Sequence, residues 1–131
     1  MTTETQPARP SRPVLWIGRV ISTLPVLMLL MSAGMKLAKS EQAMTGFRQM
    51  GFTDRAATAI GITELVCTIL YIVPQTAVLG AILLIGYLGG AVVTHVREGQ
   101  QFVIPVLLGV LLWFGLFLRD RRLRVLIPFR F

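Results

Sequence analysis

The stretch that decides the fold of this chain is residues 56–73, which read AATAIGITELVCTILYIV. These eighteen residues are apolar and small apart from a few threonines, and one carboxylate, Glu64, lies almost at their centre. A helix over this stretch places Glu64 roughly 14 Å from either end, near the midplane of a membrane. Moving a carboxylate into hydrocarbon costs from roughly 2.5 to more than 10 kcal/mol, so such acids turn inward, find a partner or stay protonated. We therefore expect the other elements to pack around this helix.

The composition predicts one small membrane domain. Of 131 residues, 54% are hydrophobic and only 15% are charged, which is too apolar for a soluble domain of this size. The net charge of +7 would suit a nucleic-acid partner, but the basic residues lie at the edges of apolar runs, where they orient the chain and meet anionic headgroups. We therefore predict no nucleic-acid binding. The lone Cys67 excludes a disulfide or Cys-x-x-Cys pair within the chain.

The apolar runs predict an all-α fold, an antiparallel bundle of four transmembrane helices over residues 14–118. The expected spans are residues 14–37, 56–73, 76–96 and 102–118. Pro25 is expected to kink the first span, and the three residues 74–76 force the second and third into a hairpin. Residues 1–13 are predicted to be a disordered basic tail and residues 119–131 a basic C-terminal tail.

A secretory signal is the alternative interpretation of the first span, because basic residues precede an apolar core and residues 32–34 resemble a cleavage site. The apolar run is longer than a typical signal core, and three further spans follow, so we favour a membrane helix.

The loop at residues 38–54 predicts a short helix lying in the membrane interface. Ala43, Met44, Phe47 and Met50 recur at helical spacing among polar residues. Gly51 is expected to end this helix, and residues 53–54 to cap the next one. An irregular loop is the alternative.

The third span contains Gly86-x-x-x-Gly90, which predicts close contact with another helix because two glycines one turn apart let backbones approach. An even number of spans puts both termini on one side. That side would hold eight basic residues, Arg9, Arg12, Arg19, Arg119, Arg121, Arg122, Arg124 and Arg130, against Lys36, Lys39, Arg48, Arg55 and Arg97 on the other. The excess predicts cytoplasmic termini.

Four scattered motifs resemble the DoxX-like family over roughly residues 14–120. They are Gly34-Met-Lys36-Leu, Phe47-Arg-Gln-Met-Gly51-Phe, Gly61-Ile-Thr-Glu64-Leu, and Ala91 with His95 before a charged turn. The resemblance implies a bacterial-type four-helix protein of the inner (plasma) membrane, and the family name comes from a terminal-oxidase or thiosulfate:quinone oxidoreductase subunit.

Glu64, Lys36 and His95 are the candidate functional residues. Glu64 is either a functional acid or a structural group hydrogen-bonded to Thr68 or Ser32. Lys36 can reach inward to Glu64 or snorkel outward, and outward is the ordinary expectation. His95 is expected nearer the surface, too far from Glu64 for a direct hydrogen bond. Tyr71 and Tyr87 are predicted to be belt or packing residues.

One histidine and one cysteine supply neither two haem ligands nor a zinc set, so we predict no metal and no cofactor. Two function classes remain. The favoured one is a non-enzymatic membrane subunit or scaffold, without activity on its own, that binds partner proteins or lipid. The alternative is a redox-associated membrane subunit that holds a quinone-like or other apolar ligand between its helices. The expected partners are the lipid bilayer, with a membrane or redox protein and a second copy of the chain as further candidates.

Overall fold

The computed structural model describes residues 11–126, and within them every regular element is helical. The elements are α1 (Arg12–Leu37), α2 (Glu41–Gln49), α3 (Asp54–Ile72), the 3-10 turn η1 (Pro74–Thr76), α4 (Ala77–Arg97), α5 (Val103–Arg119) and α6 (Arg121–Leu126). The predicted all-α class is confirmed. Three helices, α1, α3 and η1–α4 together, are long and apolar enough to cross a membrane, whereas α5 is a shorter apolar helix of 17 residues.

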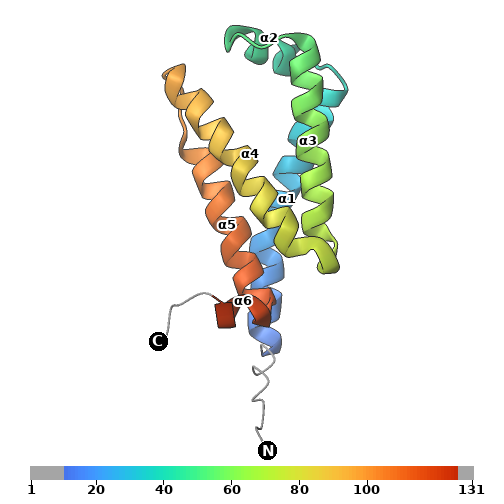
Figure 1. The fold of residues 1–131 in the computed structure, drawn as a ribbon, viewed down its shortest axis with the longest axis vertical. Helices are drawn as coiled ribbons and strands as arrows, with labels where there is room; N and C mark the ends of the chain where they lie inside the picture. Colours follow the sequence, from blue (N-terminus) through green and yellow to red (C-terminus); the bar gives the residue numbers. More distant parts are fainter. Residues whose placement is uncertain (1–10, 127–131) are drawn as a thin grey trace, which may run out of the picture.

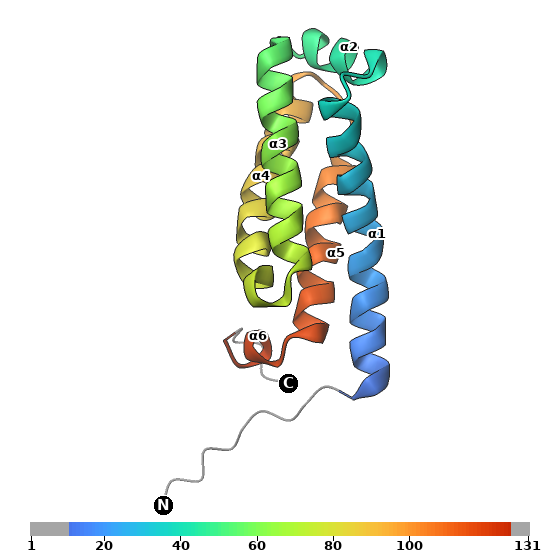
Figure 2. The same ribbon diagram turned by 90° about the vertical axis from the view of Figure 1, so that its right-hand side faces the viewer.

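The four long helices form a ring in which each packs against two others. α1 contacts α3 and α5, and α4 contacts the same two helices. α2 lies across one end of the ring, while α6 and the first turn of α1 lie at the opposite end (Figures 1 and 2). α2 therefore covers one end of the ring, and α6 lies at the other end.

The ends of the helical region differ from the sequence prediction in detail. α1 begins at Arg12, continues through Pro25, and has a proline in its first turn, where no amide donor is needed. Residues 1–10 of the predicted N-terminal tail lie outside the described part. Within the predicted C-terminal tail, residues 121–126 form α6, and its Leu123 is buried.

The predicted interfacial helix is α2, and a polar residue caps the start of α2 and of α3. The Ser40 hydroxyl accepts the amide of Ala43 at 3.2 Å, and the Thr53 hydroxyl accepts that of Ala56 at 3.1 Å. Gly51 has a φ of 84°, the left-handed conformation that reverses the chain between α2 and α3. Gly51 and Thr53 thus confirm the predicted end of α2 and the predicted start of α3.

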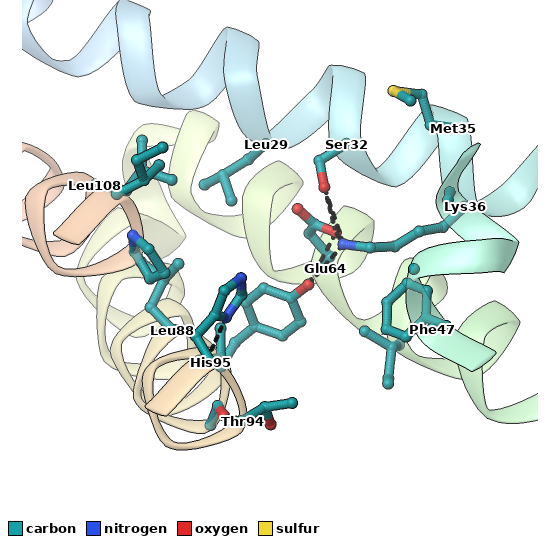
Figure 3. Close-up of a pocket in the computed structure, with 18 of the residues that line it drawn as sticks. Leu29, Ser32, Met35, Lys36, Phe47, Glu64, Leu88, Thr94, His95 and Leu108 are labelled. Carbon is teal, nitrogen blue, oxygen red and sulfur yellow. Dashed lines mark hydrogen bonds and ion pairs between the residues drawn. The ribbon is translucent and has the colours of Figure 1, made fainter. Parts of the chain in front are cut away.

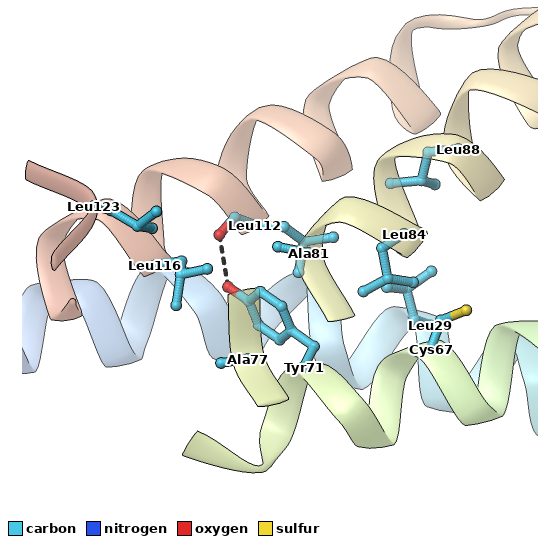
Figure 4. Packing of buried hydrophobic residues seen from close by; sticks show 10 residues of the cluster. All are labelled: Leu29, Cys67, Tyr71, Ala77, Ala81, Leu84, Leu88, Leu112, Leu116 and Leu123. Carbon is cyan, nitrogen blue, oxygen red and sulfur yellow. Dashed lines mark hydrogen bonds between the residues drawn. The ribbon is translucent and has the colours of Figure 1, made fainter. Parts of the chain in front are cut away.

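Small residues bring the helices together at the α6 end. A Cβ on Gly115 would meet the backbone of Gly18 and the backbone and hydroxyl of Ser22 in α1, and a Cβ on Gly80 would meet the backbone of α3 at Tyr71. The Tyr71 hydroxyl donates to the Leu112 carbonyl at 2.6 Å (Figure 4). The buried apolar cluster lies around this bond: Leu29, Cys67, Tyr71, Ala77, Ala81, Leu84, Leu88, Leu112, Leu116 and Leu123.

The predicted helix contact at Gly86-x-x-x-Gly90 was wrong within the chain. A Cβ on Gly86, Gly89 or Gly90 would meet no atom within 4 Å. The physical reason is that α4 diverges from α1 and α3 toward its C-terminal end (Figure 1), so glycines there face open space. The close approach uses Gly18, Gly115 and Gly80 instead.

Gly115→Ala should destabilise the fold, because the added methyl overlaps with Ser22 and with the Gly18 carbonyl, and such overpacking typically costs about 1–3 kcal/mol. Gly89→Ala is the matched control, since its methyl enters open space. Thermal unfolding in detergent should show a lower melting temperature for the first variant only. Equal melting temperatures for the two variants would contradict the close packing of Gly115 against α1.

Candidate functional site

The site begins on the buried face of α3. Ala57, Gly61, Glu64, Thr68 and Tyr71 recur every three or four residues, so one stripe of the helix faces the ring interior. Glu64 lies in this stripe and is 1% exposed. The sequence prediction that this acid turns inward is therefore confirmed.

Lys36 supplies the opposite charge. Its Nζ lies 2.5 Å from Glu64 Oε2, 2.9 Å from Ser32 Oγ and 2.9 Å from the Tyr87 hydroxyl (Figure 3). The side chain is only 12% exposed, so the expectation that Lys36 snorkels outward was wrong. The reason is local: Gly61 leaves space beside the Lys36 Cβ, and the stem follows α3 toward the acid.

Two hydroxyl groups complete the cluster. Tyr87 donates to Glu64 Oε2 at 3.0 Å, and Ser32 donates to the same oxygen at 3.4 Å. Ser32 was one of the two expected partners. The other, Thr68, donates to the backbone carbonyl of Glu64 at 2.7 Å and not to its carboxylate.

Tyr87 is the functional residue that sequence reasoning missed, since it was assigned to packing. A tyrosine near the middle of an otherwise apolar helix carries a hydroxyl that needs a partner when buried, and this was the available signal. We name Glu64, Lys36, Ser32 and Tyr87 the polar cluster. It joins α1, α3 and α4.

A cavity of about 710 Å³ adjoins the polar cluster in the half of the ring nearer α2. Its wall is mainly apolar and includes Met28, Leu29, Met31, Met35, Phe47, Met50, Ile60, Leu88, Ile104 and Leu108. Gly86 and Gly90 also line it, and their missing side chains leave it wide. Cavities of 300–1,000 Å³ with an apolar wall and a few convergent polar groups are typical ligand sites.

His95 lines the same cavity but does not join the polar cluster. Its Nδ1 lies 2.6 Å from the Ala91 carbonyl, and within residues 11–126 it has no hydrogen bond to Glu64. The carbonyl can only accept, so Nδ1 carries the proton. All three candidate residues thus line one cavity, with Lys36 and Glu64 in contact and His95 apart.

α2 closes the cavity at its outer end. The Phe47 ring lies 5.6 Å from Lys36 Nζ and packs edge-on against Phe52, with ring centroids 5.6 Å apart. Arg48 forms an exposed ion pair with Asp54 at 2.9 Å, and this hydrogen bond and charge raise the pKa of the arginine. The Arg97 guanidinium at the end of α4 donates to the Met50 carbonyl. α2 is therefore tied to both α3 and α4.

The family comparison agrees with this architecture. The model of the DoxX-like family matches residues 20–115, which include all four members of the polar cluster and His95. The chain belongs to the DoxX-like family. No curated protein and no solved structure matches it. Within residues 11–126 of this DoxX-like chain, no group of three His, Cys, Asp or Glu side chains is placed to hold a metal ion.

The buried ion pair predicts a specific stability pattern. Lys36→Met leaves the Glu64 charge without its partner, and Glu64→Leu does the same to Lys36, so each single change should cost roughly 3–5 kcal/mol. The double variant removes both charges and should be more stable than either single one. Unfolding in detergent measures this, and additive losses would contradict the pairing.

Proposed function

We propose that this DoxX-like protein is a membrane subunit without catalysis of its own that binds a quinone-like or other apolar ligand between its helices. The observation that carries the proposal is the 710 Å³ cavity, which is lined by apolar side chains and ends at the buried polar cluster. The wall suits an apolar body, and the cluster offers one polar anchor.

This proposal joins both function classes that the sequence left open. A scaffold acting only through its outer surface would not require a cavity beside a buried ion pair, which costs several kcal/mol of desolvation for each charge. Catalysis would require a group poised to react with the ligand, whereas the Lys36, Ser32 and Tyr87 side chains at the cavity are bonded to Glu64. Binding, with any redox chemistry supplied by a partner protein, fits the geometry best.

Gly90→Leu should abolish ligand retention while leaving the fold intact. The new side chain would enter the cavity, and replacing glycine by a good helix former adds roughly 0.5–1 kcal/mol to helix stability. Gly89→Leu is the control, because Gly89 lies outside this cavity and also has free space. Mass spectrometry of small molecules retained after mild detergent purification should detect the ligand in the wild type and Gly89→Leu only. Equal retention by both variants would refute the cavity as the binding site.

We further propose that α1, α3, α4 and α5 are four antiparallel spans in the inner membrane, with both termini cytoplasmic. α5 has 17 residues, the lower limit for a span. The end formed by α6 and the start of α1 carries six arginines in the described residues, Arg12, Arg19, Arg119, Arg121, Arg122 and Arg124, against Lys36, Lys39, Arg48, Arg55 and Arg97 near the α2 end.

This orientation predicts the activity of reporter fusions in a bacterial host. A phosphatase joined after residue 131 should be inactive, and one inserted at residue 99, in the turn between α4 and α5, should be active, because that enzyme matures only outside the cytoplasm. The opposite pattern would reverse the orientation, and activity of both would contradict four spans.

A further inference from the structure

We infer that the cavity selects ligands whose head group donates a hydrogen bond, that is, apolar molecules carrying a hydroxyl group. This inference rests on the proposed binding function and specifies the ligand chemistry. It follows from a count of the donors and acceptors in the polar cluster.

The donors of the cluster are all used within it. Lys36 has three ammonium hydrogens, and it has three acceptors, on Ser32, Glu64 and Tyr87. The single hydroxyl hydrogens of Ser32 and Tyr87 both go to Glu64 Oε2. No hydrogen of the cluster is left to bind a carbonyl or ether oxygen of a ligand.

One acceptor remains. Every hydrogen bond to the Glu64 carboxylate ends on Oε2, and within residues 11–126 none ends on Oε1. Figure 3 shows one carboxylate oxygen turned away from Lys36, toward the side on which Leu29 and Leu108 lie. Both leucines line the cavity, as does Glu64. Oε1 is therefore a strong acceptor at the edge of an apolar space, with unfilled lone pairs.

His95 adds a second acceptor to the same wall. Because Nδ1 donates to the Ala91 carbonyl, the lone pair of a neutral His95 ring would lie on Nε2. A ligand carbonyl would thus face acceptors at both of these positions, while a hydroxyl would be held by Oε1. Within the proposed ligand class, the wall favours hydroxyl-bearing over carbonyl-bearing molecules.

The test compares two probes with the same apolar body, para-hexylphenol and its methyl ether, by equilibrium binding to the full-length protein in detergent micelles. A hydrogen bond to a charged acceptor should make the phenol bind more tightly by about tenfold or more. Glu64→Gln should remove this preference. Its amide oxygen would take the Lys36 and Tyr87 donors, and its NH₂ group would then face the cavity as a donor.

Thr68→Val is the matched control, because it removes a hydroxyl one turn from Glu64 that bonds only the backbone carbonyl and leaves Oε1 free, and it should keep the preference for the phenol. The comparison of the two probes on the wild-type protein tests the preference for a hydroxyl group even if Glu64→Gln fails to fold. Equal binding of both probes, or tighter binding of the ether, would overturn the donor rule while leaving the cavity as a binding site. Failure of both probes to bind would overturn the proposed function, and this inference with it.

Discussion

The arrangement of this protein depends on one constraint, the need to neutralise a carboxylate in the interior of an apolar bundle. Glu64 is 1% exposed, and its charge is met by Lys36 from α1 and by the hydroxyl of Tyr87 from α4. These contacts join three helices whose apolar faces alone would not fix their rotation. A buried pair of this kind adds little net stability, but the wrong register would leave two charges unpaired. Its main effect is therefore to select one arrangement of α1, α3 and α4.

The glycines have different surroundings in the two halves of the ring, the half nearer α6 and the half nearer α2. At the α6 end, Gly18, Gly115 and Gly80 bring backbones into contact, and Tyr71 ties α3 to α5. At the α2 end, Gly86 and Gly90 face open space and widen a cavity. Without a hydrophobic driving force between helices in a membrane, close backbone packing is a main source of association. The tight half can hold the ring together while the other half remains open.

The sequence predicted the features that depend on local chemistry. The cap at Thr53, the glycine that ends α2 and the inward turn of Glu64 follow from residue type and spacing alone. The fourth span, cytoplasmic termini and ligand remain predictions. Residue type and spacing could not predict that the Lys36 side chain turns inward, because this depends on the space that Gly61 in α3 leaves beside it.

The same limit explains the errors on α4. This helix is apolar around its whole circumference, so periodicity does not identify the face that meets a neighbour. The glycines at positions 86, 89 and 90 therefore gave no indication of which contacts they make. Tyr87 lies between them, and only the tertiary arrangement brings its hydroxyl to Glu64.

Glu64 lies on α3 between the tightly packed half of the ring, nearer α6, and the half that contains the cavity, nearer α2. Tyr71 lies seven residues further along the helix, about 10 Å away, where it bonds to Leu112 in the tightly packed half. A carboxylate there would have neither the cation of Lys36 nor an adjoining cavity. One turn toward α2, Gly61 leaves room for the stem of Lys36 and has no side chain that could meet its charge. Position 64 is thus where the ion pair can form beside the cavity, with one carboxylate oxygen bonded within the polar cluster and the other without a hydrogen bond in residues 11–126.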